Sequence, residues 1–268
     1  MLAVRAIGPR ISPTTTIRIG VTAATALGAA ALPATLPTDG GPSALDRALA
    51  DPVRGMLDTR PGLAAALVVP SNAYILLPLL FLACGWFAYR GDRRSAITML
   101  VVPELAVATN TWLLKPLWGR QFHDYLAYPS GHTVHMVAIA ATFVLLAETT
   151  RARCVVCAAA SAALLVAATG MIGLDYHHPT DILGGVAAAL TLVIVSCWAA
   201  QLVWTWQDRR LQGRRSSGPD RYHAPDRTDP PRSRGVTRSG RVPASRPTAP
   251  RRPARPPLRD RAIRTPPR

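Results

Sequence analysis

The sequence predicts an all-α, polytopic membrane protein with six transmembrane helices and a disordered basic C-terminal tail. Residues 1–206 are rich in Ala, Leu and Val and break into apolar runs of about 18–24 residues, the length that crosses a hydrocarbon core of ~30 Å. Residues 207–268 differ sharply, being rich in Arg and Pro. Nothing alternates as in a β-barrel, and helices are the other structure that satisfies backbone polar groups in lipid.

The first apolar run is Ile19–Leu36, and it follows a basic segment, residues 1–18, that carries three Arg and no acid. A basic start, a short apolar core and small residues also fit a cleaved signal peptide. The run is long enough to span a membrane, so we favour a retained helix behind a cytoplasmic N-terminus. Either alternative puts the next segment on the extracytoplasmic side. This segment, residues 37–70, is predicted to be a loop with both acidic and basic residues.

The remaining runs complete a six-helix membrane domain over residues 19–206. They are Asn72–Tyr89, Ser95–Leu114, Gly131–Glu148, Val155–Leu174 and Ile182–Thr205. Aromatic residues at several of these ends are typical of the membrane interface.

Basic residues set the predicted orientation. With the N-terminus in the cytoplasm, eight Arg outside the tail fall on the cytoplasmic side, while the other side holds a nearly neutral loop and the two motif connections. The eight are Arg5, Arg10, Arg18, Arg90, Arg93, Arg94, Arg151 and Arg153. The sequence therefore predicts a multi-pass protein of the cell membrane, with both termini cytoplasmic and the connections after the third and fifth runs extracytoplasmic.

The tail, residues 207–268, holds 18 Arg, no Lys and five Asp, so it contributes 18 − 5 = +13 of the net charge of +16. With almost nothing apolar to bury, it cannot offset the entropy of ordering, and we predict disorder. No aromatic interleaving accompanies the charge as a nucleic-acid-binding module would require. Its place beside a membrane span favours anionic lipid headgroups as its partner over nucleic acid.

The connection after the third run begins at Lys115, the single lysine among 31 basic residues, and ends at Pro129-Ser130-Gly131-His132. Ser130 stands where it can cap the fourth helix. Unpaired N–H groups and the dipole make such a helix start an anion site, and Gly131 permits close approach of a ligand. This pattern predicts a phosphate site at which His132 can act.

The connection after the fifth run carries the second cluster, in which His177 and Asp181 lie four residues apart. A carboxylate that holds one imidazole nitrogen leaves the other free to attack. His177 is therefore the candidate nucleophile, and His132 the candidate acid for the leaving group. Lys115 and Arg120 would stabilise charge on the transferring phosphoryl group. Together these residues predict phosphoryl transfer through a phosphohistidine, with neither metal nor cofactor.

Three motifs, Lys115-x4-Arg120, Pro129-Ser-Gly-His132 and His177-x3-Asp181, resemble those of the phosphatidic acid phosphatase type 2 family of membrane lipid phosphatases, relatives of soluble vanadium haloperoxidases. The resemblance covers about residues 72–205. It implies that His177 is the nucleophile, supported by Asp181, that His132 is the second-motif histidine and Lys115 the first-motif lysine. It also implies phosphate contacts from Ser130 and Gly131.

The chain departs from the family pattern at two arginines. Phe122 and His123 stand where the first motif usually has Arg-Pro, and Met171 stands where the third motif usually has Arg. Arg120 is expected to take over the first of these roles, and His123 is a possible substrate contact. Because a charge-assisted hydrogen bond contributes roughly 1.5–3 kcal/mol, the two losses would weaken phosphate binding.

Alternatives remain open at this point. The resemblance implies a lipid phosphate substrate such as an isoprenoid diphosphate, phosphatidic acid or phosphatidylglycerophosphate, and the sequence does not choose among them. The same residues could transfer the phosphoryl group to an alcohol, and a catalytically weak lipid-binding protein is a further alternative. Glu104, an acid inside the third run, is as consistent with a structural role as with a functional one.

Overall fold

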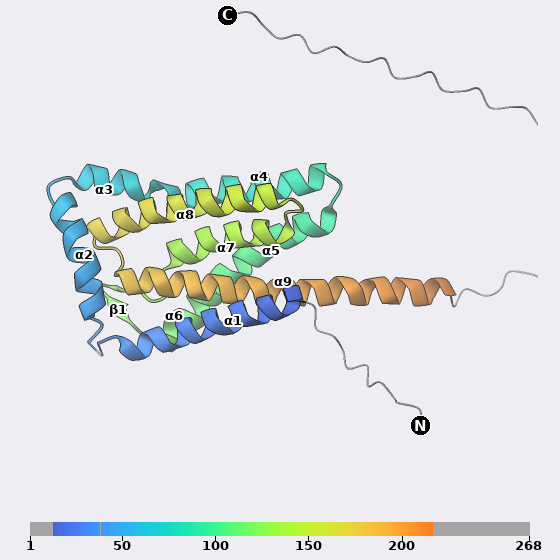
Figure 1. Cartoon of the computed structure of the whole chain (residues 1–268), viewed down its shortest axis with the longest axis horizontal. Helices are drawn as coiled ribbons and strands as arrows, with labels where there is room; N and C mark the ends of the chain where they lie inside the picture. The colour runs from blue at the N-terminus through green and yellow to red at the C-terminus, as the bar shows by residue number, and fades with distance from the viewer. Residues whose placement is uncertain (1–12, 38, 217–268) are drawn as a thin grey trace, which may run out of the picture. The chain divides into compact units, whose positions relative to one another are not determined.

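The structure is a computed structural model that describes residues 13–37 and 39–216. Six long helices run back and forth along one bundle, with their connections at its two ends (Figure 1). They are α1 (Pro13–Ala31), α4 (Ala73–Tyr89), α5 (Arg93–Thr109), α7 (Gly131–Leu146), α8 (Thr150–Gly173) and α9 (Pro179–Ser216).

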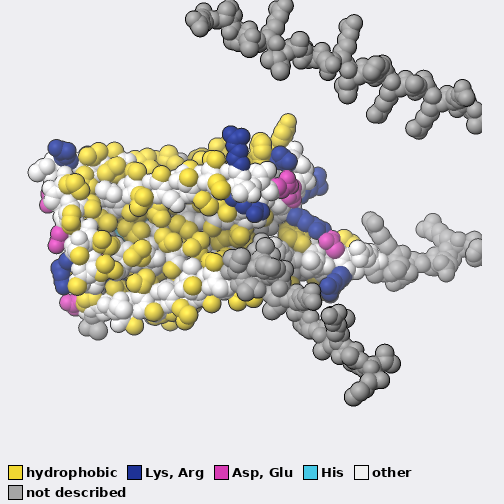
Figure 2. All heavy atoms as spheres, in the orientation of Figure 1, with side chains coloured by type: hydrophobic (Ala, Val, Ile, Leu, Met, Phe, Trp, Pro, Cys, Tyr) yellow, Lys and Arg dark blue, Asp and Glu magenta, His cyan; other side chains and the backbone are white. Residues whose placement is uncertain are grey.

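The helical bundle has the composition of a multi-pass membrane protein. Within the described residues, four helical segments are long and apolar enough to cross a membrane: Pro61–Tyr89, Arg93–Trp118, Thr150–Gly173 and Pro179–Gln212. Two further apolar helices, Ile19–Thr35 and Gly131–Leu146, are shorter. In Figure 2, apolar side chains cover the body of the bundle and charged side chains gather towards its ends. The all-α membrane fold is confirmed, with four of the six predicted spans clear by length and composition.

The segment predicted as a loop over residues 37–70 is instead mostly helical. It forms α2 (Ala44–Leu57), α3 (Pro61–Val68) and the 3-10 turn η2 (Val69–Ser71), and another 3-10 turn, η1 (Leu32–Thr35), precedes it. A capping box starts α2, because Ser43 and Asp46 each accept a hydrogen bond from the other's backbone N–H. The mixed charges that suggested a loop therefore belong to an amphipathic helix that crosses one end of the bundle (Figure 1).

The connection before α7 contains β1 (Gln121–Phe122) and β2 (Tyr125–Leu126), a two-stranded antiparallel hairpin that the all-α prediction omitted. It follows η3 (Asn110–Leu114), a π-helical stretch, and α6 (Lys115–Trp118). Gly119 ends α6 in the left-handed conformation, with φ of 61°, which glycine adopts without steric cost.

Helix α7 lies at the centre of the bundle, in contact with α4, α5, α8 and α9. One apolar cluster joins α4, α7 and α8 through residues such as Leu80, Met136 and Met171, and another joins α5, α7 and α9 through residues such as Val102, Val134 and Val193. Its first turn is thereby held in a fixed position, which matters because that turn carries part of the site.

Close packing also fixes α1 and α9. Helix α1 lies along α9, where the hydroxyls of Thr25 and Thr191 are 2.8 Å apart. The buried Tyr128 donates its hydroxyl to Ala29 O at 2.7 Å, and its ring covers Gly184, where any Cβ would lie 2.2 Å from the ring. These contacts place the first apolar run against the rest of the bundle.

Helix α9 continues past the predicted end of the membrane domain at residue 206. Residues 207–216, which the sequence analysis assigned to the tail, are the last residues of this helix. Arg94 pairs with Asp208 and lies 5.5 Å from the ring of Trp204, which ties this extension to α5. The predicted disorder of the tail beyond it, like most of the N-terminal segment, falls outside the described residues.

Candidate active site

Both motif-bearing connections lie at the same end of the bundle, together with α2 (Figure 1). The backbone N–H of Ser130 donates to Asp181 O at 3.0 Å, which joins the two connections directly. On the other side, Asn110 in the π-helical stretch donates its amide to Pro129 O at 3.4 Å. The start of α7 is thus held between the end of α5 and the start of α9.

Ser130 caps α7 as predicted, because its Oγ accepts from the backbone N–H of Thr133 at 3.5 Å and from the Thr133 hydroxyl at 3.1 Å. It is fully buried and is not among the described residues that line the cavity beside it. Gly131 does line that cavity, and a Cβ there would meet nothing within 4 Å. Of the two expected phosphate contacts, only Gly131 faces open space.

His132 and His177 come together from separate connections. Their ring centroids are 6.2 Å apart, and the rings are inclined at 72°. Both line a cavity of about 510 Å³ between α4, α5 and α7. Its walls are Ser71, Ala73, Val107, Thr111, Lys115, Tyr125, Gly131, His132, His135, Tyr176 and His177. Such a convergence of polar side chains on one cavity marks the candidate active site.

Lys115 enters the same cavity, half-buried, and its ammonium also donates to Leu126 O. Of the described residues that form the walls, it is the only Lys or Arg. Tyr125 closes another side and donates its hydroxyl to Tyr176 O. Burial raises the pKa of Tyr125, so this phenol stays protonated and keeps that hydrogen bond.

The Asp181 carboxylate lies next to the imidazole ring of His177. Its Oδ2 lies 3.9 Å from His177 Nδ1, beyond a direct hydrogen bond, and that buried nitrogen has no other partner among the described residues. The same oxygen accepts from the backbone N–H of His178 at 2.9 Å. A small movement would complete the His177–Asp181 bond, as catalytic hydrogen bonds often tighten only with substrate present.

Arg120 is held away from the cavity, in contrast to the expected phosphate contact. One guanidinium nitrogen donates to Asp181 Oδ1 at 2.7 Å and to Thr180 Oγ1 at 2.9 Å. The other donates to Gly41 O at 2.9 Å and to Asp46 at 3.3 Å. With 6% of its surface exposed, Arg120 is a buried support for Asp181, and it is not among the residues that line the cavity.

Asp46 is a site-supporting residue that the sequence analysis missed. It is fully buried and accepts hydrogen bonds from the backbone N–H and the hydroxyl of Thr180, at 2.8 and 3.0 Å. Burial acts to raise its pKa, but hydrogen bonds from Thr180 and Ser43 outweigh burial, so the pKa lies below its ordinary value. The Ser43-x-x-Asp46 capping box was the one signal in the sequence that singled out this acid.

The two positions that depart from the family pattern are filled by apolar packing. Met171 is fully buried beneath Ser130, with its sulfur 4.0 Å from the hydroxyl. Phe122 packs against His178, with ring centroids 4.4 Å apart. His178 is almost fully buried, and burial followed by the nearby Arg120 lowers its pKa, so the ring is neutral.

His123 lies outside the cavity. It adopts a left-handed conformation, with φ of 52°, and its side chain is 56% exposed, with Nε2 3.9 Å from Asp175. Asp175 in turn pairs with Arg54 of α2. The possible substrate contact by His123 therefore remains a prediction that its position does not favour.

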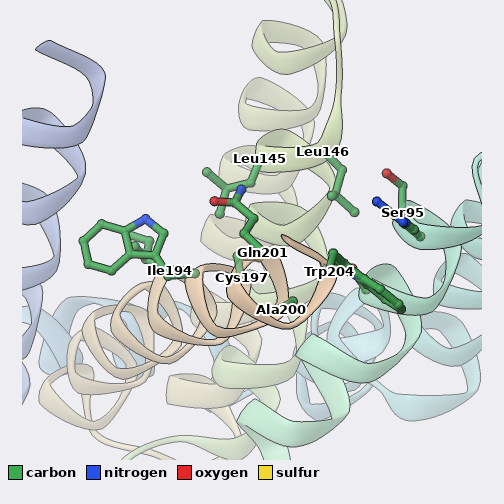
Figure 3. Close-up of a pocket in the computed structure, with 11 residues that line it drawn as sticks. Ser95, Leu145, Leu146, Ile194, Cys197, Ala200, Gln201 and Trp204 are labelled. Atoms are coloured by element: carbon green, nitrogen blue, oxygen red, sulfur yellow. The ribbon is translucent and has the colours of Figure 1, made fainter. Parts of the chain in front are cut away.

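A second cavity, of about 210 Å³, lies between α5, α7 and α9 at the other end of the bundle (Figure 3). Its lining residues include the polar Ser95 and Gln201, the ring of Trp204, and the apolar Leu145, Leu146 and Ile194. Its described lining residues include no histidine or acid, so it lacks the imidazole pair found in the histidine cavity.

Comparison with known proteins agrees with this architecture. Residues 108–207 match the model of the PAP2 superfamily. The fold is similar to that of a transmembrane PAP2-type phosphatidylglycerolphosphate phosphatase from Bacillus subtilis, with a TM-score of 0.54 and 18% identity, over 69% of this chain and 96% of that chain. A comparison with curated protein sequences finds no match.

Proposed function

Residues 108–207 match the PAP2 superfamily, and we propose that the chain is a membrane lipid phosphate phosphatase of this superfamily that acts through a phosphohistidine. The observation that carries this proposal is the convergence of His132 and His177, 6.2 Å apart, on a cavity that also contains Lys115. Two imidazoles on opposite sides of one phosphorus atom can divide the work of nucleophile and acid.

In the first step, His177 Nε2 attacks phosphorus. A nitrogen–phosphorus bond forms, the ester oxygen–phosphorus bond breaks, and His132 gives its proton to the departing alcohol. Asp181, 3.9 Å from His177 Nδ1, favours the tautomer that leaves Nε2 free and stabilises the positive charge that develops on the ring. Lys115 and the N–H groups at the start of α7 stabilise charge on the phosphoryl oxygens.

In the second step, His132 acts as a base. It takes a proton from water, the hydroxide oxygen bonds to phosphorus, and the nitrogen–phosphorus bond to His177 breaks, which releases inorganic phosphate. An alcohol in place of water would give phosphotransfer from the same intermediate, so product analysis separates the two reactions.

Two features support a lipid substrate met at the outer face of the membrane. The cavity extends from the connections to Val107 and Thr111, which belong to an apolar helical segment long enough to span a bilayer. A headgroup could therefore reach the histidines while its chains stay in the hydrocarbon. Arg90 lies on the connection between α4 and α5, and Arg93 and Arg151 lie in the first turns of α5 and α8, all at the opposite end of the bundle. The positive-inside rule would make that end cytoplasmic.

The test is phosphate release from a panel of lipid phosphates and diphosphates by the purified full-length protein, wild type against His177→Ala. Glu148→Ala, at an exposed position on the other end of the bundle, is the matched control. We expect release by the wild type and the control, a fall of at least about 10³-fold for His177→Ala, and inhibition by vanadate. Activity should survive EDTA, because the scheme uses no metal.

Two results would contradict the proposal. Equal release by wild type and His177→Ala would favour a lipid-binding protein without this catalysis. Loss of activity in EDTA, restored by a divalent cation, would contradict the metal-free scheme.

A further inference from the structure

A second polar pair lies at the edge of the histidine cavity, further along α5 and α7. His135 lines the cavity one turn further along α7 than His132, and its Nε2 is 3.1 Å from Glu104 Oε1 on α5. Its partner Glu104 is not among the described lining residues. Glu104, Val107, Thr111 and Lys115 follow one another on α5 and its continuation at spacings of three or four residues, so they share one face of the helix. That face runs from the phosphate end of the cavity to the pair.

The pair has unused hydrogen-bonding capacity. Within the described residues, Glu104 Oε2 and His135 Nδ1 have no partner. The Glu104 side chain is 45% exposed and His135 12% exposed. An ionisable side chain inside a transmembrane segment is costly and is retained mostly for function, and an acceptor without a partner in a low-dielectric setting costs free energy. A ligand that brings a donor to this point would remove that cost.

We propose that Glu104 and His135 form a subsite for a hydroxyl or amino group on the lipid, next to the phosphate. The inference rests on the proposed function, and it narrows the substrate to lipid phosphates that carry a hydrogen-bond donor close to the phosphoryl group. Examples are monoacylglycerol phosphates, sphingoid phosphates and lipids with a glycerol headgroup.

The geometry of α7 sets the reach of this subsite. His132 and His135 are three residues apart, which is a rise of about 4.5 Å along the helix. A hydroxyl on the carbon next to the phosphate ester lies at a comparable distance from phosphorus. A phosphoryl group held at His132 and His177 would therefore bring that hydroxyl to Glu104, while the chain continues along the apolar face of α5.

The same pair discriminates against other lipid phosphates. A diacylglycerol phosphate offers only ester oxygens beside the phosphate, and these accept hydrogen bonds but do not donate them. A polyprenyl diphosphate offers hydrocarbon. Both would cover Glu104 without supplying a donor, and a site built to bond a hydroxyl rejects analogues that lack one.

The experiment compares two lipids that differ by one oxygen atom: 1-oleoyl-glycerol 3-phosphate and its analogue without the 2-hydroxyl. The variants are wild type, Glu104→Leu, and Leu105→Ala as a control at the next, lipid-exposed position of α5. We expect wild type and Leu105→Ala to prefer the hydroxylated lipid by about tenfold in kcat/KM, mainly through KM. Glu104→Leu should bring the ratio close to one and leave turnover of the analogue within about threefold.

Binding of the same two lipids to the His177→Ala protein, by isothermal titration in detergent micelles, measures the preference without turnover. A ratio that Glu104→Leu leaves unchanged, or an equal loss on both lipids, overturns the subsite. So does equal affinity of both lipids for the His177→Ala protein. Failure of the proposed function is distinct, since it shows as phosphate release that does not depend on His177.

Discussion

The two sides of the loop that carries His177 and Asp181 are built in opposite ways. Behind the loop, Arg120, Asp46 and Thr180 are almost fully buried and bonded to one another and to Asp181. In front of it, the cavity contains Lys115 and three histidines that share few hydrogen bonds with protein groups. The charged groups behind the loop are buried and hydrogen-bonded to one another, and those in front face an open cavity with few partners.

This contrast shows which charges are available to a substrate. A guanidinium that already bonds two carboxylates and two carbonyl oxygens supports the loop, however close to the site it lies in sequence. A buried pair of this kind is weak evidence for net stability, but breaking it is costly, because it leaves a buried charge uncompensated. We therefore expect changes behind the loop to act first on folding, and changes in front to act on turnover.

The largest expected effect is from Arg120→Ala. Removing the guanidinium leaves two buried carboxylates without their partner, so we expect a loss of about 3–5 kcal/mol in the free energy of unfolding, together with loss of activity. Thermal unfolding in detergent, followed by circular dichroism, measures it. Normal stability with only a raised KM would place Arg120 on the phosphate instead.

Lys115→Met tests the front of the loop. We expect kcat/KM for phosphate release to fall by about 10²–10³-fold, the range found when a group that stabilises transition-state charge is removed. The midpoint of thermal unfolding should stay within about 2 °C of the wild type. A fall in stability as large as that of Arg120→Ala would remove the distinction between the two sides.

Asp46→Asn gives a smaller effect on the rear side. We expect a loss of about 1–3 kcal/mol in stability at neutral pH, because a buried charged acceptor is replaced by a neutral one. The folded-state pKa of Asp46 lies below its ordinary value, so its contribution is complete above about pH 4 and is lost as pH falls further. Unfolding measured from pH 7 to pH 3 should show less acid destabilisation in the variant, and parallel curves would contradict the assignment.

His178→Phe should have the smallest effect, and it should be favourable. His178 is buried against Phe122, neither ring nitrogen has a partner among the described residues, and its pKa lies below the ordinary 6.5. Stability that is complete above pH 6.5 should therefore fall as pH drops and the unfolded chain binds a proton. The variant should lose part of this pH dependence and gain about 1 kcal/mol, with kcat unchanged. A lower kcat would place His178 in the reaction.

Much of this architecture followed from periodicity and motif spacing. The apolar runs located the helices, and the ends of those runs placed both motif connections together. The cap at Ser130 and the approach of His132 to His177 were also predictable, because helix starts have defined chemistry and the parity of the runs puts both connections at one end of the bundle.

What the sequence did not predict are contacts between distant segments. Asp46 reaches Thr180 across 134 residues, and no local pattern reports such a pairing. Arg120 was predicted to bind phosphate because it lies close to Lys115 in the sequence. Its ion pairs with Asp46 and Asp181 instead determine the direction of its side chain. The helix over residues 44–57 was not predicted, because mixed charges and Pro52 are typical of a loop. The Ser43–Asp46 capping box was the signal that favoured a helix.

The long-range bond of Asp46 has a practical consequence for dissecting the molecule. The region recognised as PAP2, residues 108–207, excludes this acid as well as the helix that covers Tyr128. A fragment limited to residues 108–207 would leave Arg120 without its partner Asp46, and it would remove the helix that packs on Tyr128. A shortened form of this chain would therefore need to keep Ala29 and Asp46, or would need both contacts to be redesigned.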